Sequence, residues 1–290
     1  MQLARRPTAT ALAPPWLTLP VLVGGIVVTF WVAVALTIEL WSPYAPLDMV
    51  APRLQPPGAD HLLGTDALGR DVLARTLHGA RHSIPIAVMV VVAAAALGAL
   101  LGAISGFVGG LAGGAIMRLV DVTLAFPPVL LAMAVAASLG PGLENAAIAM
   151  IVVWWPVYAR LMRAQVLDVK QREHVEAAVA GGAGPLRVLV VHILPLCWTP
   201  VLINATMDFG QVVLLAASLS FIGLGALPPT PEWGSMISDG AVHFYHWWIA
   251  FGPGMAILTV VLGFNFLGDG LRDILDPRLG PSVGDTPLKK

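Results

Sequence analysis

The sequence predicts an all-α polytopic membrane protein with six transmembrane helices, and three observations support this fold class. Of the 290 residues, 57% are hydrophobic and 11% are charged, whereas soluble domains carry roughly 25% charged residues. Six apolar stretches are long enough to cross a hydrocarbon core of about 30 Å as helices. Lysine and arginine are concentrated in the connections on one side of these stretches, as in multi-pass proteins of known orientation.

The first stretch is residues 16–38, which contains no charged residue and follows Arg5 and Arg6. It is longer than the roughly 7–15 apolar residues of a cleavable signal peptide. We therefore expect a retained first transmembrane span, within residues 16–40, preceded by a cytoplasmic tail of residues 1–15.

Residues 41–83 form a connection that is too long to be a turn. It is rich in proline through Pro57, which favours extended backbone. From about Asp66 it becomes amphipathic, because leucine and valine recur at helical spacing among charged residues. We predict an extracytoplasmic segment that ends in an interfacial helix leading into the second span.

The remaining chain divides into a core domain, residues 84–275, and a cytoplasmic tail, residues 276–290. The core contains five predicted spans, at 84–107, 119–139, 145–166, 197–222 and 249–271. Twelve of the sixteen lysine and arginine residues lie on the cytoplasmic side if both termini are cytoplasmic. The other four are all in the segment 41–83, so the positive-inside rule favours this orientation.

Composition also limits the partners and the chemistry. The net charge is −1, so there is no global basic field of the kind that attracts nucleic acid, and membrane lipid is the expected surroundings. The one cysteine, Cys197, excludes a disulfide framework within the chain. The sequence has no Gly-rich phosphate loop and no nucleophile placed beside a base, so we predict that the chain is not an enzyme and binds no cofactor or metal of its own.

The connection 166–195 is polar and lies on the predicted cytoplasmic side. It contains a run of good helix formers beginning at Glu173, which a glycine cluster around Gly182 ends, followed by an amphipathic stretch that ends at Pro195. The small side chains of Ala177 and Ala178 would allow another protein to approach the helix closely. Charged neighbours would supply polar contacts around it.

The same connection resembles the cytoplasmic loop of permease subunits of binding-protein-dependent ABC importers. The resemblance lies in Glu-Ala-Ala at 176–178, Gly182 and the Leu-Pro pair at 194–195; His192 stands where isoleucine is usual, as in the peptide-transporting branch. In that family the loop forms a coupling helix that sits in a groove of the ATPase subunit. The resemblance implies ATPase-coupling roles for Glu173, Glu176, Ala177, Ala178, Gly182, Leu194 and Pro195.

Further motifs between about residues 60 and 280 resemble the C-type subunit of dipeptide and oligopeptide permeases. They are Gly64-Thr65-Asp66, Leu68-Gly69-Arg70-Asp71, Gly79-Ala80-Arg81, Leu219-Ser220-Phe221, Trp233-Gly234 and Gly268-Asp269-Gly270. The resemblance implies a type I importer fold in the bacterial inner membrane. It also implies a homologous second permease, two ATPase subunits that bind ATP and Mg²⁺, and an extracytoplasmic substrate-binding protein.

Two carboxylates in predicted spans need an explanation, because a charge in the hydrocarbon is costly unless it is paired or hydrated. Asp208 either faces the translocation path, where it would meet a positive group, or is a hydrogen-bonded packing or gating residue. For Asp121 we expect an ion pair with Arg118.

His243 and His246 suggest either a metal-ligand pair or, with neighbouring tryptophans, an aromatic belt at the interface.

Glycines at 98, 102 and 106 recur every fourth residue and predict a close helix contact, either within the chain or with the second permease.

The sequence leaves three functional classes open. The chain imports short peptides as part of an ATP-driven complex; it belongs to a nickel or metal-chelate importer of the same kind; or it is an ion-coupled secondary carrier, which would need no ATPase and would show inverted repeats.

Overall fold

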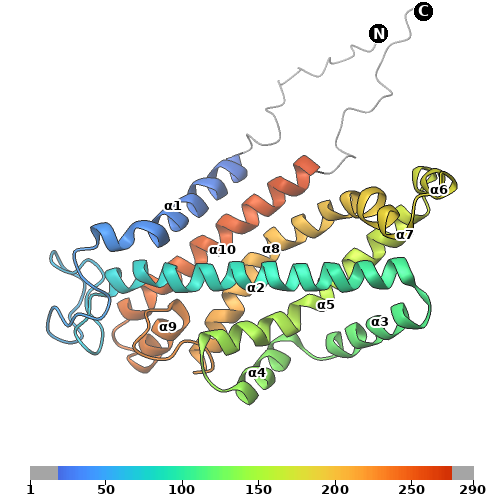
Figure 1. Cartoon of the computed structure of the whole chain (residues 1–290). Coiled ribbons are helices and arrows are strands. Elements are labelled where there is room, and N and C mark those ends of the chain that lie inside the picture. Colours follow the sequence, from blue (N-terminus) through green and yellow to red (C-terminus); the bar gives the residue numbers. More distant parts are fainter. Residues whose placement is uncertain (1–18, 276–290) are drawn as a thin grey trace, which may run out of the picture.

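The computed structural model describes residues 19–275, and this part of the chain is helical, without a β-strand (Figure 1). The elements are α1 (Leu19–Trp41), α2 (Val72–Val108), α3 (Gly110–Leu124), α4 (Pro128–Leu139), α5 (Leu143–Lys170), α6 (Glu173–Ala180), α7 (Pro185–Arg187), the π-helical turn η2 (Val188–Ile193), α8 (Leu194–Phe221), α9 (Trp233–Val242) and α10 (Trp248–Leu275). Five helical segments are long and apolar enough to span a membrane, and the number rises to the predicted six if the bent pair α3 and α4 is counted as one span. The predicted all-α polytopic fold is confirmed, and the orientation stays a prediction; both tails, 1–15 and 276–290, lie outside the described residues.

The long helices run side by side, so the bundle has two ends (Figure 1). The start of α1, the end of α10 and α6 lie at one end, which we call the α6 end. The connection between α1 and α2, together with α9, lies at the other, which we call the α9 end.

The second span differs from its prediction. We expected an interfacial helix before residue 84, but α2 is one continuous helix of 37 residues that contains Pro85. The first turns of this helix pack against α9: Trp233 donates a hydrogen bond to the Thr76 carbonyl oxygen at 2.8 Å, and a Cβ on Gly79 would lie 2.7 Å from the Trp233 ring. The apolar side of the amphipathic pattern therefore serves tertiary packing.

The third predicted span is not one straight helix. α3 begins at Gly110, well before the predicted residue 119, and meets α4 at an angle of 94°. The break falls at Phe126-Pro127-Pro128, where two successive prolines lack the amide hydrogens that would continue the helix. The chain restarts with Pro128 in the first turn of α4, a position that proline tolerates.

The predicted glycine contact forms within the chain, between α2 and α5. A Cβ on Gly98 would lie 2.3 Å from the Trp155 carbonyl oxygen, and one on Gly102 would lie 2.3 Å from that of Ala159. Only glycine allows the two backbones to come this close. The seam fixes α5, and with it the position at which α6 leaves the bundle.

Helix α1 packs against α2 and α10 at the side of the bundle (Figure 1). Most of its side chains are exposed, as expected of a helix that faces lipid, while Trp31, Val34 and Ile38 are buried. The Trp31 indole donates to the Thr259 hydroxyl at 3.0 Å, which ties α1 to α10.

Candidate functional site

Helix α6 projects from the end of α5 and is held to the bundle by one buried side chain (Figure 1). Val175 is 3% exposed and packs in an apolar cluster with Val169, Val188 and Ile193. Glu173, Glu176 and Ala177 are exposed, and Ala178 is half-buried. The helix therefore has one anchored face and one free face that carries two carboxylates and small side chains.

Gly182 ends α6 through its backbone conformation. Its φ is +83°, in the left-handed region, and its amide donates to the Val179 carbonyl oxygen at 3.0 Å. The next amide, of Ala183, donates to the Ala178 carbonyl oxygen at 3.0 Å, which completes a Schellman motif. A Cβ on Gly182 would meet no atom within 4 Å, so the glycine is required by the turn and not by close packing.

Polar contacts fix the approach to α6. Lys170 at the end of α5 donates to the Phe107 carbonyl oxygen at 2.8 Å and lies over the Phe107 ring at 5.3 Å from its centroid. His174 on α6 contacts the His192 carbonyl oxygen at 3.3 Å. A largely apolar groove of about 510 Å³ lies between these elements, with Lys170 and Glu176 among its lining residues. These contacts connect α6 and its approach to α2, α5 and η2.

Leu194 and Pro195 do not lie on the exposed face of α6. We predicted that the second amphipathic stretch would end at Pro195, and this is wrong: Pro195 occupies the first turn of α8, and the chain is helical from Pro185 through Phe221. Proline is accepted there because a first-turn amide has no intrahelical partner. Leu194 packs beside the apolar cluster that receives Val175, so this pair connects α6 to α8.

Asp208 lies near the middle of α8 and is half-buried. Asn204, one turn earlier, donates from Nδ2 to its Oδ2 at 2.8 Å. Its neighbours include Tyr158 and Trp154 of α5. The Tyr158 hydroxyl is buried without a hydrogen bond of normal length and angle in the described part of the chain. The Asp208 carboxylate is hydrogen-bonded within the chain, as expected of a packing or gating residue. It also borders a cavity, as expected of a residue on the translocation path.

That cavity has a volume of about 470 Å³ and lies between the α3–α4 break, α5 and α8. Asp208, Gln211 and Ser218 place polar groups in its otherwise apolar wall. Polar groups inside a membrane bundle mark a hydrated path or a protein contact more often than lipid.

Asp121 pairs with Arg160 of α5, with 2.7 Å between Oδ1 and Nη2, so the predicted pair with Arg118 is wrong. Arg160 reaches across from the neighbouring helix, a contact that sequence spacing does not reveal. Both side chains are more than half exposed, at 65% and 58%. An exposed ion pair is costly in hydrocarbon, so we do not expect this side of α3 and α5 to face lipid tails.

A second polar cluster, at the α9 end, explains several of the sequence motifs. Asp66 accepts hydrogen bonds from the amides of Leu68 and Arg70, and its Oδ2 lies 2.7 Å from Arg70 Nε. Arg75 Nε lies 3.5 Å from the same oxygen, and all three charged side chains are buried. Asp71 caps α2 by accepting from the Ala74 amide at 2.7 Å. These residues shape the connection between α1 and α2.

Glu232, one of two carboxylates in the loop 223–248, was not predicted as a site residue. It is 2% exposed and caps α9, accepting hydrogen bonds from the amides of Gly234 and Ser235 at 3.0 Å each. Burial raises the pKa of its carboxyl group above the ordinary value, although these amides act in the opposite direction. A glutamate before Trp-Gly gave a weak capping signal, but local sequence does not reveal its contact with Ser83, 149 positions away, which donates to Oε1 at 3.4 Å.

His243 and His246 lie in the turn between α9 and α10, with their ring centroids 6.4 Å apart. Within residues 19–275 no group of three or more histidine, cysteine, aspartate or glutamate side chains is arranged to hold a metal ion. Phe244, Tyr245 and Trp247 around them are largely exposed, a placement typical of aromatic side chains at a membrane interface.

Comparison with known proteins places the chain among transport proteins. Residues 98–281 match the family described as "Binding-protein-dependent transport system inner membrane component". The chain is 49% identical over 269 residues to the dipeptide transport system permease protein DppC of Escherichia coli K12, covering 88% of this chain and 89% of that protein. It is 44% identical over 265 residues to the di/tripeptide transport system permease protein DppC of Pseudomonas aeruginosa UCBPP-PA14, covering 88% of each. It is also 42% identical over 235 residues to a probable D,D-dipeptide transport system permease protein of E. coli K12, covering 81% of this chain and 78% of that protein.

Proposed function

Because the chain belongs to the family of inner-membrane components of binding-protein-dependent transport systems, we propose that it is a permease subunit that imports short peptides at the expense of ATP hydrolysed by partner subunits. It is a multi-pass protein of the bacterial inner membrane. The observation that carries the peptide assignment is the 49% identity, over almost the whole of both chains, to a dipeptide permease.

The partners follow from the family. A homologous second permease would complete the pore, two ATPase subunits would bind ATP and Mg²⁺, and a substrate-binding protein would deliver the peptide from outside. The exposed ion pair Asp121–Arg160 and the cavity beside Asp208 support a protein partner on the α3, α4 and α5 side of the bundle. The positive-inside rule supports a cytoplasmic location for the α6 end.

Helix α6 is proposed to carry the coupling. Its free face offers Glu173, Glu176 and Ala177 to an ATPase subunit, while Val175 and the Schellman turn at Gly182 fix it to the bundle. ATP binding and the loaded binding protein would then bias the same two-state movement of the bundle from opposite ends. Leu194 and Pro195 would transmit the movement of α6 into α8.

Asp208 is proposed to line the translocation path. It borders the cavity between α5 and α8 with Gln211 and Ser218, and one of its oxygens is held by Asn204. A fixed carboxylate in such a path would attract the ammonium group of a peptide. A role in gating would use the same hydrogen bonds without contact to the substrate.

Uptake of labelled dialanine into proteoliposomes tests this function. The vesicles contain the full chain with the second permease and the ATPase subunits, together with the loaded binding protein. We expect uptake that requires internal ATP and survives an ionophore. Uptake that follows an ion gradient without ATPase subunits would favour a secondary carrier, and uptake of a nickel chelate but not of peptides would favour the metal-importing branch.

A further inference from the structure

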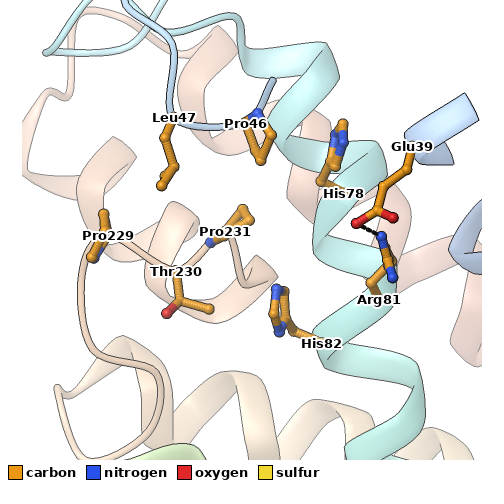
Figure 2. A pocket seen from close by; sticks show the side chains of 9 residues that line it. All are labelled: Glu39, Pro46, Leu47, His78, Arg81, His82, Pro229, Thr230 and Pro231. Atoms are coloured by element: carbon orange, nitrogen blue, oxygen red, sulfur yellow. Dashed lines mark ion pairs between the residues drawn. The ribbon is translucent and has the colours of Figure 1, made fainter. Parts of the chain in front are cut away.

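A cavity of about 450 Å³ lies at the α9 end, where three parts of the chain meet (Figure 2). Glu39 reaches it from the last turn of α1, and His78, Arg81 and His82 reach it from one side of α2. The loop 229–231, with Thr230 between two prolines, forms the opposite wall. Its volume is within the range of sites for small ligands.

The charged groups in this cavity are one of each sign. Arg81 and Glu39 form an ion pair, with side chains 36% and 67% exposed, so both charges remain accessible to a bound molecule. The arginine has further N–H groups beyond the one in the pair. With neutral histidines the lining has no net charge, which fits a zwitterion better than a strongly charged anion.

Uncharged polar groups complete the set of donors and acceptors. The His82 ring and the Thr230 hydroxyl line the cavity, and Figure 2 shows both side chains beside it. His78 contacts the Ala74 carbonyl oxygen through Nδ1 at 2.8 Å, which places the ring proton there and leaves Nε2 as an acceptor when the ring is neutral. The cavity thus offers donors on Arg81, His82 and Thr230, and acceptors on Glu39 and His78.

The cavity lies at the level expected for lipid headgroups. The charge-free stretch of α2 begins at Ile84, directly after Arg81 and His82, and α1 ends at Trp41, two residues beyond Glu39. Trp41 is half exposed, as is usual for tryptophan at the membrane interface. Because α1 packs at the side of the bundle, lipid has access to its end.

We propose that this cavity binds the headgroup of a zwitterionic phospholipid that carries a primary ammonium group. Arg81, His82 and Thr230 hold the phosphate oxygens, and Glu39 accepts from the ammonium group. The bound lipid joins the end of α1 to α2 and to the loop before α9, so it stabilises the α9 end of the bundle.

Lipid retention by the purified full chain tests this proposal. The protein is exchanged into detergent with equal amounts of phosphatidylethanolamine and phosphatidylglycerol, and retained lipid is measured by native mass spectrometry. We expect Arg81→Gln to reduce retained phosphatidylethanolamine by about tenfold, as for loss of a charge-assisted hydrogen bond. Arg53→Gln, at an exposed position outside the cavity, is the matched control and retains wild-type levels.

Two further variants keep the test decisive. Thr230→Trp fills the cavity from the half-buried side chain of the loop opposite α2 and causes the same loss even if Arg81→Gln fails to fold. Glu39→Gln leaves a net positive lining, so retention shifts from phosphatidylethanolamine to phosphatidylglycerol. Wild-type retention in both Arg81→Gln and Thr230→Trp would overturn the proposal. Displacement of the lipid by inorganic phosphate or by dialanine would also overturn it, since the cavity would then belong to a soluble ligand.

Discussion

At the scale of single residues, Glu232 has the clearest dependence on pH. Its buried carboxyl group has a raised pKa, so the folded protein binds this proton more tightly than the unfolded chain. The associated stability is fully present below the ordinary pKa of 4.5 and is lost as pH rises through the raised value.

Glu232→Gln removes this titration and keeps one oxygen that can cap α9. We therefore expect the melting temperature of the wild type, minus that of the variant, to be more positive near pH 5 than near pH 8. Differential scanning fluorimetry of the full chain in detergent measures this difference. An equal difference at the two pH values would show that the carboxyl group has the same proton affinity in the folded and unfolded states.

Gly182 offers a second test at this scale, because its φ of +83° is unfavourable for any residue with a Cβ. Gly182→Ala should destabilise the end of α6 by about 1–2 kcal/mol. Gly184→Ala is the matched control, since Gly184 has a φ of −65° and open space around its Cβ position. Hydrogen exchange of the α6 amides should accelerate in the first variant only; equal exchange in both would contradict the Schellman turn.

At the scale of elements, the seam between α2 and α5 determines where α6 is presented. Gly102→Val would place a side chain against the Ala159 backbone, where a Cβ alone would lie 2.3 Å from the carbonyl oxygen. Since neither backbone can move easily, we expect the free energy of unfolding to fall by about 3 kcal/mol. Gly114→Val on α3, where a Cβ meets nothing within 4 Å, should have a much smaller effect. Thermal unfolding of the two variants compares them, and equal melting temperatures would argue against the seam.

The elements also show how far the sequence alone could lead. Apolar length predicted the crossings, and helix-forming residues followed by glycine predicted α6 from its first residue, Glu173. The continuity of α2 through Pro85 could not be predicted, because it depends on α9 packing against the first turns of α2. The 94° break at Phe126-Pro127 was concealed by apolar residues on both sides, although the two prolines were a visible signal.

The functional residues also divide into those that local sequence predicts and those that depend on contacts between distant positions. Glu173, Glu176 and Gly182 are close in sequence, so local pattern was enough to group them on α6. Asp121 was assigned the wrong partner because Arg160 is 39 positions away. Whether these side chains act in coupling or in transport depends on partner subunits, which no pattern within one chain contains.

At the scale of the whole molecule, we expect the proposed second permease to bind on the polar side formed by α3 and α5. Asp121→Arg leaves two like charges facing each other, so we expect reduced co-purification of the partner permease. The exchange Asp121→Arg with Arg160→Asp restores opposite charges and should restore assembly. Normal assembly of the single variant, or no recovery in the double variant, would indicate that this side meets water or another surface.

The central claim is that α6 links ATP hydrolysis in partner subunits to peptide movement through this chain, and the ratio of peptide imported to ATP hydrolysed tests it most directly. The measurement compares proteoliposomes of the complete complex carrying the wild-type chain, Glu176→Arg or Gly182→Trp. Gly254→Trp, at an α10 glycine with open space around its Cβ position, is the control for added volume. We expect both α6 variants to assemble in the membrane but to lose ATP-driven uptake, while the control transports normally. Uptake at the wild-type ratio with α6 altered would contradict a coupling role for this helix.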